Sequence, residues 1–513
     1  MPSLRPSASD GHALSEIAMR FAQRVIGEVG TTVVTGVELS SRDVRPGDLF
    51  AALPGANQHG AVFADNALVA GAVAILTDVA GAEIIADAPV PVLVVDSPRD
   101  ILGDVAAHVY DSQDETRLTF GVTGTNGKTS IVYCLAAILE AIGLTTALST
   151  TAQRRIGARE ITSGLTTPEA PELHAFMALA REAGAQALAL EVSAQALTRS
   201  RVSGIHFDVV GFANLSHDHL DDYATFEDYF EAKSRLFRSG VAARAVVCVD
   251  DNWGLRLAES IQIPSTTIAT REDVVADWRV EILGESFERT TFRVYSDDIS
   301  IVSHIPVLGD FMALNAALAI VMVIESGFEP ADVENAIGGS QGIPVYIPGR
   351  LEVVSGPVGP VFVVDYGHTP EAFRASLESL RRVTPGRIIM VFGADGDRDV
   401  AKRSELGAIS ARLADIVIIT DYHPRSEDPA RIRAALLAGA VGARPDGDIR
   451  EEPDPARAVR LAISLAHVGD VIFYAGPGHE EYREQAGKKI PYNAREDVRK
   501  ALGEAGYVVG ENR

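Results

Sequence analysis

The sequence is poor in cysteine and in long apolar runs, and each shortage excludes a class of protein. Only two cysteines occur, Cys134 and Cys248, too few for a disulfide framework or a cysteine metal quartet, which fits a reducing compartment. The longest apolar runs, such as ALVAGAVAIL at 67–76, fall short of the roughly 18 residues that a membrane helix needs. The first residues contain no apolar signal-peptide core. We therefore predict a cytoplasmic protein without a membrane partner.

Basic residues are also in deficit. Lys and Arg number 46 against 70 Asp and Glu, so the formal net charge is −24. Because phosphate backbones attract Lys- and Arg-rich faces, we expect no nucleic-acid partner. The acidic surface is typical of a chain kept in solution by its charge, and an anionic substrate would need locally concentrated basic residues.

The 513 residues divide into three regions by their patterns. Residues 1–115 mix strands and helices and end in a polar linker, DSQDETR. Residues 116–345 alternate buried strands with helices, which indicates a parallel sheet covered on both faces. Residues 278–307 alternate with a shorter period, typical of an antiparallel hairpin, and a helix is expected at 311–326. Residues 346–513 alternate strand and helix again.

The predicted fold is therefore α/β with three domains. We expect a mixed N-terminal domain (1–115), a central parallel-sheet domain with a phosphate-binding loop (116–345) and a C-terminal Rossmann-like, doubly wound domain (346–513).

The stretch FGVTGTNGKTS (120–130) joins a strand to a helix through a loop of small residues. It fails the strict Walker pattern, because Val122 occupies the position of the first glycine. The features by which such a loop binds phosphate are still present: Gly124 and Gly127 let backbone N–H groups face phosphate oxygens at a helix N-terminus. Lys128 can neutralise phosphate charge, and Thr129 can hold Mg²⁺. The alternative is a tight turn with a solvated lysine.

Three further candidates in the central region are ambiguous on their own. Glu191 ends an apolar strand and would suit a magnesium ion if that strand neighbours the loop, but it could equally be a surface or salt-bridged residue. His217 and His219 form a weak zinc pattern without a matching Cys/His set. Lys233, on a predicted helix, would ordinarily be solvated.

Polar residues follow four strands of the C-terminal region. They are found in DYGHTP (365–370), GDRD (396–399), DYHPRSEDP (421–429) and GPGHE (476–480). Carboxyl ends of parallel strands meet at one crevice, so we expect these residues to share a ligand site. Asp365 could accept a hydrogen bond from a ribose hydroxyl, while Arg398 and Arg425 could bind carboxylates. For any one of them, a helix cap or a surface charge is an equally good interpretation.

Together these motifs resemble the Mur ligases, and most of all their MurE type. The resemblance covers nearly the whole chain and includes LSSRDVRPGDLFAALPGANQHG (39–60). It is carried by FGVTGTNGKTS, LTTPEAPEL, EVSAQAL, NLSHDHLD, FEDYFEAKSRLF, PGRLEVV, DYGHTPEAF, FGADGDRDVAKR, YHPRSEDP and GPGHE, in that order.

The resemblance implies an ATP- and Mg²⁺-dependent amide ligase of peptidoglycan precursor synthesis. It would add an amino acid to UDP-N-acetylmuramoyl-L-alanyl-D-glutamate through an acyl phosphate, and we expect a monomer. By motif match, the catalytic residues are Lys128, Glu191, His219 and Lys233. The implied magnesium ligands are Thr129, Glu191, His219 and Lys233 as a carbamate. The nucleotide would contact Gly124, Thr125, Asn126, Gly127, Lys128, Thr129, Ser130, Asn315, Arg350 and Asp365. The UDP-sugar dipeptide would contact Ser40, Ser41, Thr166, Thr167, Ser193 and Arg201. The incoming amino acid would contact Arg398, Tyr422, His423, Arg425, Gly476 and Glu480.

The departures from the family pattern lie mainly at substrate positions. Ala194 and Gln195 replace Ser-His, and Tyr422 and His423 replace the Asp-Asn typical of diaminopimelate enzymes, while Arg425 is kept. The added amino acid is therefore left open among diaminopimelate, lysine, ornithine and less common ones. Two other functions remain: a related ligase with altered substrates in specialised metabolism, and a non-catalytic nucleotide-binding relative. The second predicts loss of Lys128, Thr129 or Lys233, and all three are present.

Overall fold

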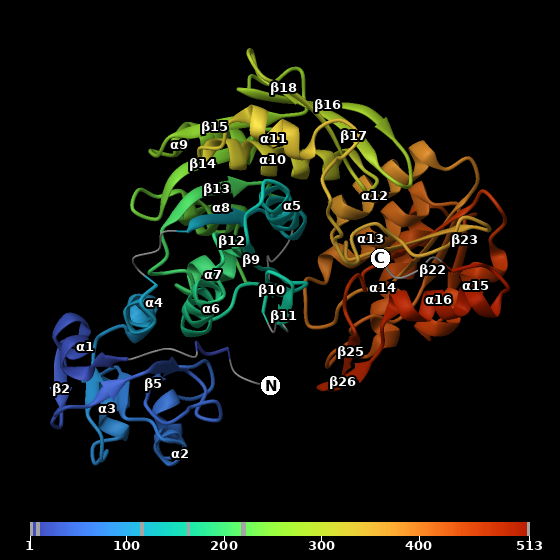
Figure 1. Ribbon diagram of the computed structural model, residues 1–513. Coiled ribbons are helices and arrows are strands. Elements are labelled where there is room, and N and C mark those ends of the chain that lie inside the picture. Colours follow the sequence, from blue (N-terminus) through green and yellow to red (C-terminus); the bar gives the residue numbers. More distant parts are fainter. Residues whose placement is uncertain (1–3, 7–10, 113–116, 162–164, 217–221, 510–513) are drawn as a thin grey trace.

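Three large sheets follow one another along the chain (Figure 1). The structure is a computed structural model that describes residues 4–6, 11–112, 117–161, 165–216 and 222–509. Strands from the first hundred residues form the first sheet, those between 118 and 305 the second, and those between 352 and 475 the third. This confirms the α/β class with three domains. The exact domain boundaries stay a prediction, and the linker expected at 111–117 lies partly outside the described residues.

The N-terminal sheet has five strands in the order β2-β7-β6-β5-β4. Only β2 runs antiparallel to its neighbour. Its strands are β2 (Arg24–Ile26), β4 (Gly36–Glu38), β5 (Asp48–Ala52), β6 (Ala74–Thr77) and β7 (Val92–Val94), beside a small pair of β1 (His12–Ala13) and β3 (Val33–Val34). The helices are α1 (Leu14–Phe21), α2 (Ala64–Ala70), α3 (Val79–Ile84) and α4 (Pro98–Val109).

The central sheet has eleven strands in the order β11-β10-β9-β12-β8-β13-β14-β15-β16-β17-β18. The seven strands from β9 to β16 in this order are parallel, as predicted, and antiparallel strands extend both edges. The expected hairpin is thus a three-stranded meander continuous with the main sheet. The strands are β8 (Leu118–Thr123), β9 (Thr146–Ser149), β10 (Arg154–Ile156), β11 (Arg159–Ile161), β12 (Ala187–Glu191), β13 (Phe207–Phe212), β14 (Ala242–Cys248), β15 (Ser265–Ala269), β16 (Trp278–Glu285), β17 (Thr290–Tyr295) and β18 (Ser300–Ile305).

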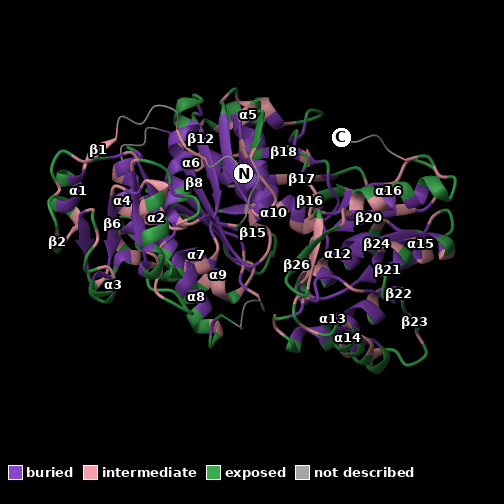
Figure 2. Ribbon diagram, turned by 90° about the horizontal axis from the view of Figure 1, so that it is seen from below, coloured by how far each residue is buried: buried purple, intermediate pink, exposed green. Residues whose placement is uncertain are grey.

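Two nearly all-apolar helices, α5 (Lys128–Ala141) and α10 (Asp310–Glu325), pack against each other on one face of this sheet. A helix that is apolar all round must be covered on every side, and both lie in the buried interior (Figure 2). The second of them confirms the helix expected at 311–326. The remaining helices of the region are α6 (Ala170–Glu182), α7 (Ala194–Thr198), α8 (Phe226–Ser234), α9 (Asn252–Ser260) and α11 (Pro330–Ile337).

The C-terminal sheet has six strands in the order β19-β20-β24-β21-β22-β23, all parallel except β19. Helices cover both of its faces, with α12 to α14 in one apolar cluster and α15 and α16 in another, which confirms the doubly wound arrangement. The strands are β19 (Glu352–Val353), β20 (Val361–Asp365), β21 (Ile388–Phe392), β22 (Ile416–Ile419), β23 (Asp448–Glu451) and β24 (Val471–Ala475). The helices are α12 (Pro370–Val383), α13 (Ala401–Leu413), α14 (Pro429–Ala443), α15 (Pro455–Leu465) and α16 (Ala494–Glu504).

The sequence patterns did not predict two features of the C-terminal region. The strand β23, with sequence DIRE, lies between the helices α14 and α15. A hairpin of β25 (Tyr482–Gln485) and β26 (Lys488–Pro491) precedes the last helix. These strands are short, charged and partly exposed, so they lack the apolar run by which a buried strand is recognised. Among the described residues, no helix combines the length and apolarity needed to cross a bilayer.

Candidate active site

A cavity of about 770 Å³ lies between the central and C-terminal sheets. Its wall comes from the loop after β8, the ends of β12 and β13 and the start of α10 on one side. The loops after β20, β21, β22 and β24 form the other side. These loops all follow the carboxyl ends of parallel strands, the usual place for a ligand in such sheets. The C-terminal side chains expected to share a crevice therefore line one cavity together with the phosphate loop. They include Asp365, His368, Arg398, Arg425 and Glu480.

The phosphate loop joins β8 to α5 in the conformation that its glycines suggest. Gly127 immediately precedes α5 with φ of 88°, the left-handed region that favours glycine. A Cβ atom there would lie 2.5 Å from Oδ1 of Asn315 on α10, so a side chain is excluded. The backbone N–H of Asn126 donates to Oδ1 of Asn214 at 2.9 Å, which ties the loop to the end of β13. Thr125 and Ser130 also line the cavity.

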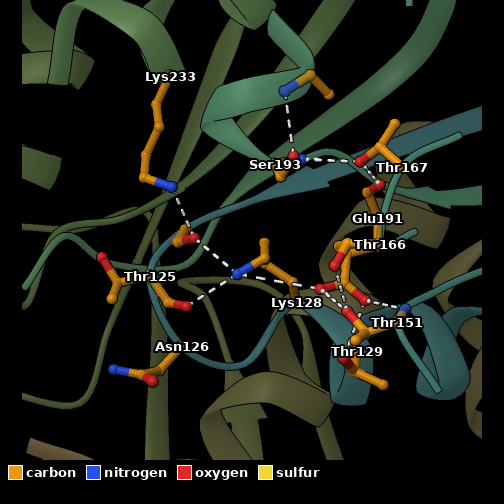
Figure 3. A network of polar contacts seen from close by, with 12 residues as sticks. Thr125, Asn126, Lys128, Thr129, Thr151, Thr166, Thr167, Glu191, Ser193 and Lys233 are labelled. Atoms are coloured by element: carbon orange, nitrogen blue, oxygen red, sulfur yellow. Dashed lines mark hydrogen bonds and ion pairs between the residues drawn. The ribbon is translucent and has the colours of Figure 1, made fainter. Parts of the chain in front are cut away.

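The ammonium group of Lys128 is held above this loop (Figure 3). Nζ donates to the carbonyl oxygens of Gly124 at 3.0 Å and Thr125 at 2.8 Å. It lies 3.9 Å from Oε1 of Glu191, and the side chain is mostly buried. The solvated-lysine alternative is therefore wrong, because the cation is kept where the loop would receive a phosphate.

Glu191 ends β12, which pairs directly with β8, so the strand neighbourhood that its prediction required is present. The carboxylate is 3% exposed. Oε2 accepts from the Thr129 hydroxyl at 2.9 Å and from the Thr151 backbone N–H at 3.0 Å, and Oε1 accepts from the Thr151 hydroxyl at 3.1 Å. A buried carboxylate next to a threonine hydroxyl provides oxygen ligands of the kind that Mg²⁺ prefers. The surface alternative for Glu191 is excluded, whereas the salt-bridged one is borne out by the ion pair with Lys128.

Lys233, on α8, is buried as well, with 1% exposure. Its Nζ donates to the carbonyl of Gly124 at 2.8 Å and lies 4.4 Å from the centre of the Tyr229 ring. The same Gly124 carbonyl also accepts from Lys128, so both lysines converge on one point of the loop (Figure 3). A solvated role for Lys233 is thereby excluded. His217 and His219, predicted nearby, lie outside the described residues.

Arg350 joins the two walls of the cavity. Its Nη2 donates to the Thr129 hydroxyl at 3.1 Å, and its guanidinium carbon lies 4.3 Å from the centre of the Tyr366 ring. Asp365 uses both oxygens within its own domain: Oδ1 accepts from the Leu351 N–H at 2.8 Å and Oδ2 from the Gly367 N–H at 2.7 Å. Asp365 therefore shapes the loop that carries Arg350, while both residues still line the cavity.

The residues predicted for the UDP-sugar dipeptide are only partly brought together. Thr166, Ser193 and Arg201 line the cavity. Thr167 lies behind them, and its hydroxyl donates to the Glu191 carbonyl at 2.8 Å. Ser40 and Ser41 follow β4 in the N-terminal domain and are not among the residues that line the cavity.

At the far end of the cavity, Glu480 accepts hydrogen bonds from two neighbouring rings. Tyr422 donates its hydroxyl to Oε2 of Glu480, and Nε2 of His423 lies 2.6 Å from the same oxygen. Burial, and next the charge of Glu480, raise the pKa of Tyr422 well above its ordinary value, so the phenol stays protonated. Gly476 follows β24 close to the Tyr422 ring but is not itself part of the lining.

Comparisons with known proteins agree with this geometry. Residues 33–110 match the catalytic domain of the Mur ligase family, residues 122–323 the Mur ligase middle domain, and residues 349–478 the glutamate ligase domain. A UDP-N-acetylmuramyl-tripeptide synthetase of Leifsonia xyli subsp. xyli is 54% identical over 99% of both chains. The chain belongs to the Mur ligase family. It is an ATP-dependent ligase that forms a peptide bond.

Two other relatives carry a more specific name. A UDP-N-acetylmuramoyl-L-alanyl-D-glutamate--2,6-diaminopimelate ligase of Streptomyces coelicolor is 40% identical, covering 97% of this chain and 98% of its own. A solved structure of a ligase of that name aligns with a TM-score of 0.66 at 27% identity, covering 97% of this chain and 100% of its own.

This Mur ligase also has site residues that its sequence did not single out. Thr151 contacts both oxygens of Glu191, and the Tyr366 ring lies against Arg350. Asp395 and Glu484 flank Arg425. Asp395 could have been found, because it directly precedes the GDRD segment after an apolar strand. Glu484 carried no signal, since it lies on the hairpin that the patterns missed.

Proposed function

We propose that this enzyme adds a diamino acid, of the diaminopimelate or lysine type, to UDP-N-acetylmuramoyl-L-alanyl-D-glutamate in peptidoglycan precursor synthesis. The names of the relatives in Leifsonia xyli and Streptomyces coelicolor support this assignment. The single observation that carries it is the shared cavity: the phosphate loop with Lys128 and Glu191 faces the arginines Arg398 and Arg425 across one space. An activated carboxyl group and an incoming amine can meet there.

The reaction transfers the terminal phosphoryl group of ATP to the D-glutamate carboxylate. The incoming amine then attacks the acyl carbon, and the amide forms with release of ADP and phosphate. Lys128 holds positive charge at the loop that receives the phosphates, and this stabilises the charge that develops during transfer. Arg350 approaches the same point from the C-terminal domain, so its contact with Thr129 also aligns the two halves of the site.

The donor set at the loop fits a magnesium ion. Thr129 offers a hydroxyl and Glu191 a carboxylate within 2.9 Å of each other, and hard oxygen ligands of this kind suit Mg²⁺. When bound, the ion would neutralise phosphate charge during transfer. Lys233, as a carbamate, would replace a cation by a third oxygen ligand beside the loop, and His219 completes the predicted ligand set.

The remaining assignments follow from the family pattern. Ser40, Ser41, Thr166, Thr167, Ser193 and Arg201 would hold the UDP-sugar dipeptide. Contact by Ser40 and Ser41 requires a ligand long enough to reach the N-terminal domain from the cavity, as a nucleotide-sugar peptide is. Action in the cytoplasm, as a monomer and without a nucleic-acid partner, remains a prediction of the sequence.

The test is phosphate release from ATP with Mg²⁺ and UDP-N-acetylmuramoyl-L-alanyl-D-glutamate, against a panel of amino acids, with mass spectrometry of the product. We expect turnover that depends on both the nucleotide sugar and one amino acid, with a product heavier by one amino-acid residue. A protein that binds ATP yet turns over with no member of the panel contradicts the proposed acceptor and points to a different carboxylate.

A further inference from the structure

We propose that the amino acid selected by this enzyme ends its side chain in an ammonium group without a carboxylate beside it, as in lysine or ornithine. The inference rests on the proposed function and names the class of its amine. It is carried by one end of the cavity, which we call the amine end and which is lined by Asp395, Tyr422, His423, Arg425, Glu480 and Glu484.

The arginine that would bind a distal carboxylate already faces carboxylates of the protein. Nη2 of Arg425 lies 3.4 Å from Oδ1 of Asp395, and its Nε lies 3.9 Å from Oε2 of Glu484. The backbone holds Arg425 in this place, because its N–H donates to the Glu484 carbonyl at 3.0 Å. A substrate carboxylate at this guanidinium would therefore have to displace Asp395 or lie next to it.

Glu480 presents the opposite situation, because the donors to its carboxylate among the described residues are neutral groups. The backbone N–H of Glu484 donates to Nδ1 of His423 at 2.7 Å. Since that nitrogen is an acceptor, the proton of the ring is on Nε2, which donates to Glu480 at 2.6 Å, and the imidazole is neutral. The Tyr422 phenol is the second donor. Both bonds end on Oε2, and no described residue donates to Oε1.

The charges at the amine end therefore call for a cation. Asp395, Glu480 and Glu484 contribute three carboxylates, of which the guanidinium of Arg425 faces those of Asp395 and Glu484, and Asp395 and Glu480 are largely buried. A distal ammonium can bond to the remaining oxygen of Glu480 and compensates its charge. A distal carboxylate, as in diaminopimelate, adds a fourth negative group to this end, and like charges at short range oppose binding.

The amino acid's own α-carboxylate need not enter this end. Arg398 lines the same cavity and is the cation expected to hold it. The proposal thus separates two tasks: Arg398 recognises the carboxylate common to all amino acids, and Glu480, fixed by Tyr422 and His423, recognises the distal ammonium.

The first experiment compares kcat/KM for L-lysine, L-ornithine and meso-diaminopimelate, with the full chain, ATP, Mg²⁺ and the nucleotide-sugar dipeptide. We expect lysine or ornithine to exceed diaminopimelate by about 100-fold or more. Higher kcat/KM with diaminopimelate overturns the inference and leaves the proposed function standing. If none of the three amino acids is turned over, both the inference and the proposed function are overturned.

The second experiment uses the variant Asp395→Asn, which removes the carboxylate facing Arg425. The ratio of kcat/KM for diaminopimelate over that for lysine should rise about tenfold or more, because the guanidinium is released. Asp446→Asn is the matched control, since this exposed residue is remote from the cavity, and its ratio should equal that of the unmodified enzyme. An unchanged ratio in a folded Asp395→Asn protein overturns the assignment.

Discussion

Replacing Glu191 by glutamine separates the charge of this residue from its structural contacts. The Thr151 backbone N–H can only donate, so the glutamine oxygen must take the place of Oε2, where it also accepts from Thr129. The amide nitrogen then faces the Thr151 hydroxyl, which can turn to accept while its one proton goes to Thr166. All three contacts survive, so the hydrogen bonds by themselves should change the free energy of unfolding by about 1 kcal/mol or less.

The functional effect of Glu191→Gln should be much larger. The carboxylate lies 3.9 Å from the Lys128 ammonium, and at an effective dielectric constant of about 20 that attraction is about 4 kcal/mol. The same negative charge is the protein's contribution to holding Mg²⁺ beside Thr129. A loss of about 100-fold in magnesium affinity, or about 2.7 kcal/mol, is the smallest effect that we expect.

The assay is the initial rate of phosphate release against Mg²⁺ concentration, with urea unfolding of the same preparations. Glu259→Gln is the matched control, because this exposed glutamate on α9 is not part of the cavity wall. Two results would refute the reasoning. An unchanged magnesium dependence in Glu191→Gln would remove this carboxylate from the metal site. A drop in unfolding free energy well above about 4 kcal/mol, the attraction to Lys128 that the variant loses, would show that the hydrogen bonds cannot rearrange as described.

The remaining predictions concern both lysines and a buried histidine. Lys128→Ala should abolish phosphate release while its circular dichroism stays that of the unmodified enzyme; retained turnover would exclude the loop from the chemistry. Lys233→Ala should be inactive and partly rescued by added short carboxylates, because these replace the carbamate oxygens; full activity without them would disprove the carbamate. Burial lowers the pKa of His174 from its usual 6.5 to about 4, so the unfolded chain binds the extra proton first as pH falls. Stability should therefore decrease by about 2 kcal/mol between pH 7 and pH 5, and by less in His174→Gln, as urea unfolding at both pH values would show.

Much of the fold follows from local patterns in the sequence. The apolar run of β8, the glycines of the loop and the apolar helix α5 predict a phosphate-binding turn without any knowledge of the rest of the chain. Alternating strands and helices likewise predict the parallel core of the second and third sheets. What these patterns could not reveal are short charged strands such as β23 and β25, which are stabilised by neighbours rather than by an apolar face of their own.

The candidate site, too, was partly predicted from local patterns and partly decided by the tertiary structure. Motif spacing singled out Lys128, Glu191, Lys233 and Arg425, and it left open whether each was buried or solvated. Only the order of the strands decided this, because it brings Glu191 to Thr129 across 62 positions and Lys233 to Gly124 across 109. One partner of Arg425, Glu484, was decided by the hairpin that carries it, and the other, Asp395, by the loop after β21. Local backbone geometry determines which residues can form a loop or a strand, whereas the charge balance of a pocket depends on which distant segments the sheets place side by side.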